Sequence, residues 1–208
     1  MIVLALVSTA RADLVPSSSV LVDVRYSTEL SGDTELDNAV ALGTRTRHLF
    51  GRSISYCAGF DAEIGNASTG LVYEAELYAL GAGYPIGDDG LVSLCTGAGL
   101  SGVRGSLPFA WQFPLELSGE IQFGSIRGLG WIRTRWIAGE DSRQDGSDLA
   151  GFADELDLTL GVRLGKTSRY WSRVTSGHGL FFGISYREQA SAHYGGIVIG
   201  LSMWGGRR

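Results

Sequence analysis

The stretch Glu155-Leu-Asp-Leu-Thr-Leu-Gly-Val-Arg-Leu-Gly165 decides the fold, because polar and apolar side chains alternate along it without a break. Leucine or valine occupies every even position from 156 to 164, and acidic, hydroxyl, glycine or arginine residues occupy the odd positions. A period of two places successive side chains on opposite faces only in a β-strand. The stretch therefore predicts a strand with one apolar and one charged face.

The same alternation recurs along most of the chain, in segments close to the roughly 9–11 residues that a tilted strand needs to cross a bilayer. Besides 155–165, it marks the segments 20–30, 53–65, 71–78, 91–103, 112–124, 131–138, 180–187 and 193–204. A membrane barrel with both chain ends on one side needs an even number of strands. A weaker alternation over 38–50 supplies a tenth strand. We therefore predict a closed antiparallel up-and-down transmembrane β-barrel of ten strands, with eight strands as the alternative.

The length of 208 residues suits one domain, and the chain has no Pro-rich or Ser-rich linker. A short apolar run at its start ends in Ala10-Arg11-Ala12, the A-x-A pattern of a signal-peptidase site. We interpret 1–12 as the remnant of a signal peptide and 13–208 as a single barrel domain, the alternative being a hydrophobic first strand. No run of about 18 apolar residues is present, so the sequence contains no candidate transmembrane helix.

Alternation alone does not say which face points outward, because soluble barrels such as lipocalins bury their apolar face. A solvated outer face normally carries many lysines, but Lys166 is the only lysine in this chain. Charged residues make up 19% of the sequence, compared with roughly 25% in soluble domains. The apolar faces lack charges in mid-strand, as contact with lipid requires. We therefore expect the apolar faces to point outward.

Aromatic residues gather near the ends of the predicted strands, where membrane proteins carry interfacial girdles. By this pattern, rather than by a family motif, the chain after Ala12 resembles small bacterial outer-membrane β-barrel proteins in general. The resemblance implies the outer membrane as location, and membrane lipids, lipopolysaccharide and the barrel-assembly machinery as partners. Such proteins commonly end in an aromatic residue on the last strand, and Trp204 is similar although four residues follow it. The candidate girdle residues are Tyr84, Phe109, Trp111, Phe113, Phe123, Tyr186, Tyr194 and Trp204.

If the polar faces point inward, the barrel interior contains a dense set of opposite charges. A barrel of eight to ten strands is just wide enough for side chains to fill, so we expect these charges to pair and plug it. The alternative is a water-filled lumen whose surplus of carboxylates favours cations. The residues of this predicted lumen network are Asp23, Glu29, Asp61, Glu63, Glu74, Glu76, Glu116, Glu120, Glu155 and Asp157, facing Arg25, Arg45, Arg47, Arg133, Arg135, Arg163 and Arg187.

The two cysteines cannot form a structural zinc site without clustered partners, and we expect no metal or cofactor. Cys57 and Cys95 fall on the polar faces of strands that are not neighbours in sequence. We expect two buried thiols rather than a disulfide, although an oxidising compartment would allow one bridge. The net charge of −5 also argues against a nucleic-acid partner, which would require a basic face.

An enzymatic role would rest on His48, His178 or His193 with a hydroxyl such as Ser185, as in barrel enzymes that act on lipids. Neither the order nor the spacing of these residues implies that a base reaches a nucleophile. We therefore expect a non-enzymatic outer-membrane barrel with a structural, loop-mediated binding or limited small-solute pore role. A barrel enzyme acting on lipid is the first alternative, and a soluble lipocalin-like periplasmic binder is the second.

Overall fold

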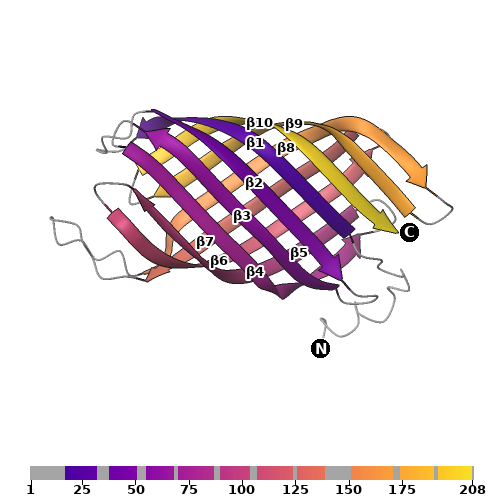
Figure 1. The fold of residues 1–208 in the computed structure, drawn as a ribbon, viewed down its shortest axis with the longest axis horizontal. Helices are drawn as coiled ribbons and strands as arrows, with labels where there is room; N and C mark the ends of the chain where they lie inside the picture. The colour runs from indigo at the N-terminus through magenta and orange to yellow at the C-terminus, as the bar shows by residue number, and fades with distance from the viewer. Residues whose placement is uncertain are drawn as a thin grey trace.

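The computed structural model is an all-β closed barrel of antiparallel strands (Figure 1). None of the described segments is a helix long and apolar enough to cross a membrane. The predicted signal-peptide remnant at 1–12 lies outside the described residues. The residues that the structure describes are those of β1 (Ser17–Ser31), β2 (Asn38–Phe50), β3 (Ser55–Ala67), β4 (Gly70–Ile86), β5 (Gly90–Val103), β6 (Leu107–Phe123), β7 (Ile126–Ala138), β8 (Gly151–Tyr170), β9 (Val174–Gln189) and β10 (Ala192–Arg207).

Each strand pairs with its neighbours in sequence, and β1 closes the barrel against β10 over the register from Ser18–Gly205 to Ser31–His193. The prediction of ten strands is confirmed, and the alternative of eight is wrong. The weakly alternating segment is a full member of the wall, since β2 pairs with both β1 and β3. Closure leaves no unpaired sheet edge, which is what a sheet surrounded by lipid requires.

Some strands are longer than their alternation predicts. β7 begins at Ile126, five residues before the expected start at Trp131. Gly128 and Gly130 occupy outward positions in this extension, so the apolar alternation is interrupted there although the pairing with β6 continues. Backbone hydrogen bonds to a neighbouring strand therefore extend β7 where the side-chain pattern gives no signal.

The two ends of the barrel differ in their connections. β1 begins and β10 ends at one end, called the terminal rim, which Figure 1 shows on the right. The connections at the terminal rim are residues 51–54, 87–89, 124–125 and 171–173. The opposite end, called the distal rim, has the longest connection of the barrel at 139–150. At the terminal rim, consecutive strands are thus separated by two to four residues, whereas one connection at the distal rim has twelve.

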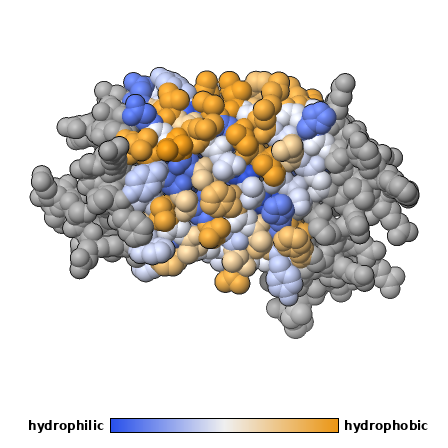
Figure 2. Space-filling view, in the orientation of Figure 1, coloured by the Kyte–Doolittle hydropathy of each residue, from blue (hydrophilic) through white to orange (hydrophobic). Residues whose placement is uncertain are grey.

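The apolar faces of the strands point outward on all sides of the barrel, as the sequence predicts. Leu160 has 51% of its surface exposed, while its neighbour Thr159 is fully buried in the interior. Figure 2 shows many apolar residues spread across the described part of one outer face. Of the predicted girdle residues, Tyr84, Trp111, Phe113, Phe123 and Tyr186 face outward.

Two of the predicted girdle residues are corrected by the structure. Tyr194 and Trp204 are buried and point into the barrel, because they alternate with the outward-facing Ile197 and Met203. The aromatic residue near the end of β10 is therefore not a lipid-facing side chain. The side chain of Phe109 lies outside the described part of the structure.

The expectation of two free thiols is wrong, because Cys57 of β3 and Cys95 of β5 form a disulfide. β4 lies between these strands and crosses beneath the bridge at Gly81. A Cβ atom at Gly81 would lie 2.8 Å from Cys57 Cβ and 2.8 Å from Cys95 Cα. The absence of a side chain at this one position lets the two cysteines approach to a Cα–Cα distance of 5.9 Å across an intervening strand.

We predict that Gly81→Ala destabilises the barrel by about 1–3 kcal/mol, the usual cost of overpacking a filled interior. Gly119→Ala is the matched control, because a Cβ there meets only Val92 Cγ2, at an ordinary 3.9 Å. Equilibrium unfolding in urea with folded barrel quantified by gel mobility would measure both. Equal stability of the two variants would contradict the close approach at Gly81.

Candidate functional site: the charged barrel interior

The interior of the barrel is where the chemically distinctive side chains converge. Arginines from β1, β2, β7, β8 and β9 meet carboxylates from β1, β3, β4, β6 and β8, because every second residue of each strand points inward. The inward arginines are Arg25, Arg45, Arg47, Arg127, Arg133, Arg135, Arg163 and Arg187, and the inward carboxylates are Asp23, Glu29, Asp61, Glu63, Glu74, Glu76, Glu116, Glu120, Glu155 and Asp157.

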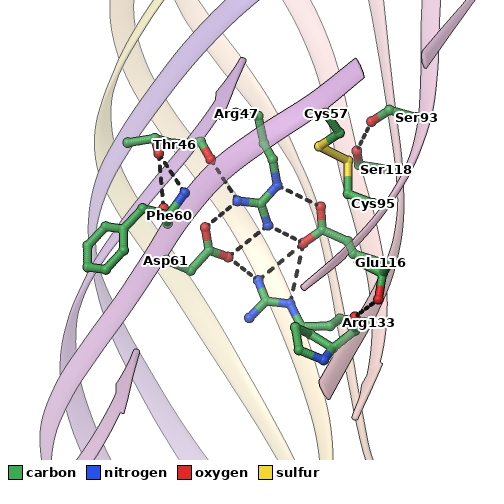
Figure 3. Close-up of a disulfide and its surroundings, with 12 residues drawn as sticks. Thr46, Arg47, Cys57, Phe60, Asp61, Ser93, Cys95, Glu116, Ser118 and Arg133 are labelled. Carbon is green, nitrogen blue, oxygen red and sulfur yellow. Dashed lines mark hydrogen bonds and ion pairs between the residues drawn. A yellow bond between two sulfur atoms is a disulfide. The ribbon is translucent and has the colours of Figure 1, made fainter. Parts of the chain in front are cut away.

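Glu116 of β6 is the centre of the network and is fully buried. Both of its oxygens accept hydrogen bonds of 2.5 Å from the Arg45 guanidinium, a bidentate pairing. Arg47 donates to the same carboxylate at 2.7 Å and 3.1 Å, and Arg133 approaches it at 3.3 Å. Asp61 lies beside Glu116 and accepts from Arg47 and Arg133, both at 2.5 Å (Figure 3). Three guanidinium groups thus share two carboxylates at the core of the lumen, and Arg133 also pairs with Glu74 and Glu76.

A second cluster surrounds Arg135 of β7, whose side chain is also fully buried. Its guanidinium donates to Glu74 at 2.5 Å, to Glu76 at 2.8 Å and to Glu155 at 3.0 Å. Glu76 additionally accepts hydrogen bonds from Gln112 Nε2 at 2.9 Å and from the Tyr78 hydroxyl at 2.8 Å. The carboxylate of Glu76 is therefore surrounded by donors on all accessible sides, as a buried charge requires.

Two further groups of ion pairs complete the interior. Arg25 and Arg187 both lie 3.4 Å from Asp157, and both also pair with Glu63. Closer to the terminal rim, Glu120 pairs with Arg127 and lies 3.8 Å from Arg163. The Arg163 guanidinium stacks on the ring of the inward-facing Trp204 at 4.6 Å.

Apolar side chains fill the parts of the interior that the ion pairs leave. Leu21, Trp131, Phe181 and Val198 form one cluster, and Leu49, Tyr78 and the disulfide form another. Arginines join these clusters to the charged network, since Arg45 stacks on Trp131 at 4.3 Å and Arg47 stacks on Tyr78 at 3.8 Å. The result is an interior occupied by side chains, with a charged centre and apolar packing next to it.

An internal cavity among these groups is small. It is lined by Asp23, Arg25, Asp157 and Trp131, among others, and has a volume of 30 Å³. A polar space of this size has room for ordered water.

All the predicted lumen residues are among the inward charges described above, with Glu29 lying opposite the inward-facing Tyr194. Each of the predicted arginines contacts a carboxylate. The sequence prediction did not include Arg127 and Trp131. Both have the same parity along β7 as Arg133 and Arg135, and this would have identified them as inward-facing.

The residues considered for catalysis are not brought together. Ser185 is buried in the interior, whereas His178 is exposed on the outer face of the same strand. His193 also lies on the outer face, where it stacks on Tyr186, and His48 contacts Ser18 there. The sheet wall therefore separates the hydroxyl from all three histidines. Among the described residues, no group of three or more His, Cys, Asp or Glu side chains is arranged to hold a metal ion.

No protein-family model matches the chain, and no curated protein matches it. Among solved structures, the chain is similar to the β domain of the Bordetella autotransporter Brka, with a TM-score of 0.49 and 10% sequence identity. The match covers 92% of this chain and 98% of that one. At this level of similarity we draw no conclusion about function from the match.

We predict that Glu116→Gln destabilises the barrel by roughly 3–5 kcal/mol, because it leaves buried guanidinium groups without their carboxylate. Glu120→Gln on the same strand is the matched control, and we expect a smaller loss because 17% of that side chain is exposed to solvent. Urea unfolding of both variants in detergent micelles would measure the difference. Equal losses would show that the central network does not depend on Glu116.

Proposed function

We propose that this chain is a bacterial outer-membrane β-barrel with a closed interior, which serves as a membrane-embedded scaffold for the connections at its distal rim. The observation that carries the proposal is the distribution of polarity across the wall. Aliphatic and aromatic side chains face outward on every strand, and paired charges face inward. A soluble barrel has the opposite arrangement.

The exposed apolar surface supports a lipid environment. Leucine, isoleucine and valine side chains such as Ile184 and Leu201, each with 65% of its surface exposed, recur on the outer face around the barrel. Soluble monomers rarely expose a contiguous apolar patch larger than a few hundred Å². A continuous apolar surface around a closed barrel is suited to contact with acyl chains.

Outward-facing aromatic residues support the same proposal by their position along the strands. Most of them lie towards one end of the barrel or the other, as expected for side chains at the two membrane–water interfaces, while Phe60 and Phe182 lie near mid-strand. On β6 and β7, Phe113 and Trp136 pack against each other at 5.2 Å between ring centroids. The aromatic residues towards the distal rim are Tyr26, Tyr73, Trp111, Phe113, Trp136 and Tyr186, and those towards the terminal rim are Phe50, Tyr56, Tyr84 and Phe123.

The unequal connections suggest how the barrel lies in the membrane. Outer-membrane barrels have short periplasmic turns and longer extracellular loops. On this basis the terminal rim faces the periplasm, and the connection at 139–150 faces the outside. Its sequence includes the acidic stretch Glu140-Asp-Ser-Arg-Gln-Asp-Gly-Ser-Asp148, so the scaffold would present an anionic segment to the cell exterior.

The filled interior favours a scaffold over a pore. Four groups of ion pairs and two apolar clusters occupy the lumen between the rims, and a conducting path would have to displace buried, mutually paired charges. Removing either partner of such a pair is costly, so thermal opening of a path is rare. The acidic surplus of the chain would matter for ion selectivity only if the lumen were open.

Cell fractionation, gel mobility and planar-bilayer recording together test this function. We expect the protein in the outer-membrane fraction, and we expect unboiled samples to migrate differently from boiled samples, as closed barrels do. We expect no stepwise conductance from the folded protein, in a bilayer where a general porin gives clear steps. Release into the soluble fraction would refute the membrane assignment, and reproducible cation-selective steps would refute the closed interior.

We predict that Leu160→Arg destabilises the folded barrel in lipid vesicles by about 2–4 kcal/mol, because an outward charge in mid-strand must enter the hydrocarbon. Ile126→Arg is the matched control, since Ile126 is also exposed but begins β7 at the terminal rim, where the cost falls to about 0–1 kcal/mol. Urea titration of both variants in vesicles would measure the difference. A neutral effect of Leu160→Arg would argue against immersion in lipid.

A further inference from the structure

We infer that the Cys57–Cys95 disulfide forms before the barrel closes, by thiol–disulfide exchange between the unassembled chain and a disulfide oxidant. Both cysteines point into the interior, and each has only 1% of its surface exposed. A bond that forms by intermolecular chemistry needs access for its reagent. The folded barrel offers the sulfur atoms almost none.

The groups that enclose the bridge come from several strands. Leu49 of β2, Tyr78 of β4 and Leu91 of β5 pack in the same cluster as the two cysteines. Next to them, the Arg47 guanidinium bonds to Glu116, as Figure 3 shows, and it also stacks on the ring of Tyr78. The hydrogen-bonded hydroxyls of Ser93 and Ser118 lie on the neighbouring β5 and β6. The sheet closes the bridge off from the outside, and these side chains close it off within the lumen.

The chemistry of exchange explains why this enclosure matters. The thiolate of one cysteine attacks a sulfur of the oxidant's disulfide, forming a mixed disulfide and releasing one oxidant thiolate. The thiolate of the second cysteine then attacks the first cysteine's sulfur, forms the Cys57–Cys95 bond and releases the second oxidant thiol. Two electrons pass to the oxidant, and two protons leave the cysteine thiols. The mixed disulfide requires the oxidant to be covalently attached inside the lumen, where packed side chains leave no room for it.

The strands that carry the cysteines can bring them together without the rest of the barrel. β3, β4 and β5 are consecutive and pair as a meander, so the bridge spans only 38 residues of sequence. Gly81 of β4 lies between the cysteines and leaves room for the bond. The enclosing Leu49, Arg47 and Glu116 belong to β2 and β6, which flank this meander. The meander can therefore be oxidised first and enclosed afterwards.

The order places an oxidation step upstream of barrel assembly. The chain that closes into the barrel is therefore already oxidised. Its two thiols have reacted with a disulfide donor in an oxidising compartment. The inference depends on the closed fold and the burial of the sulfur atoms, and it holds whether or not the interior conducts ions.

The test compares oxidation of the reduced chain before and after closure. Reduced full-length protein is held in urea or folded into detergent micelles, and oxidised glutathione is added to both. Samples are then denatured, and free thiols are counted by the gel shift of a polyethylene-glycol maleimide. We expect oxidation of the folded barrel to be at least about 100-fold slower, because the barrel must open before exchange occurs. Rates within about threefold of each other would overturn the inference.

If the reduced chain does not fold into a closed barrel, that result supports oxidation before closure. Reduction of the oxidised, folded barrel is then the measurement that can refute the inference. Oxidised, folded barrel is treated with dithiothreitol while gel mobility reports that it stays folded. We expect the bridge to persist until the barrel is heated. Reduction at the rate of the urea-unfolded chain, without loss of the folded band, would overturn the inference.

A pair of single-cysteine variants controls for reagent access. Cys95→Ser leaves only Cys57, which points inward, whereas Tyr56→Cys in a Cys57→Ser, Cys95→Ser background places the thiol one residue away on the exposed outer face. We expect N-ethylmaleimide to label the outer thiol at least about 100-fold faster in the folded barrel and at a similar rate in urea. Equal labelling in the folded state would show that the lumen admits reagents at this depth.

Discussion

The pairing of guanidinium groups with carboxylates inside the barrel is the constraint on which the rest of the structure depends. An isolated charge in such an interior would cost many kcal/mol, so each inward arginine needs an acidic partner. Many of these partners come from strands that are not adjacent: Arg133 of β7 contacts Asp61 of β3, and Arg25 of β1 contacts Asp157 of β8. Ion pairing and barrel closure are therefore coupled, because in an open sheet the charges on non-adjacent strands would lack their partners.

The preference for arginine over lysine follows from the same constraint. Arg133 approaches Asp61, Glu74, Glu76 and Glu116 at once, which a forked guanidinium with five donors can do and a compact ammonium group cannot. The planar guanidinium also stacks on aromatic rings, as Arg45 does on Trp131. Arginine can therefore lie at the boundary between the charged centre and the apolar clusters. A chain with one lysine among 17 basic residues is consistent with this use.

The sequence predicted the strands, their faces and the charged interior, because a period of two is a local property that each strand displays by itself. It did not predict which charges pair, since Arg25 and Asp157 meet across the lumen only after ten strands adopt one register. The disulfide was missed for a related reason: its reach depends on a single glycine in the strand between the cysteines. The inward orientation of Trp204 could have been predicted, because Trp204 has the opposite parity along the strand to the outward Ile197 and Met203. The prediction followed instead the general pattern of terminal aromatic residues in outer-membrane barrels.

The volumes of the interior side chains explain why many inward positions of the wall are glycines. A barrel of this size leaves little room for eight arginines unless other inward positions are nearly empty. A Cβ atom at Gly59 would lie 3.0 Å from Arg47 Nη1, and one at Gly43 would lie 3.1 Å from Asp23 Oδ1. At Gly99 it would lie 2.8 Å from Glu76 Cγ. Inward-facing glycines such as these thus provide the space in which the charged side chains of neighbouring strands reach one another.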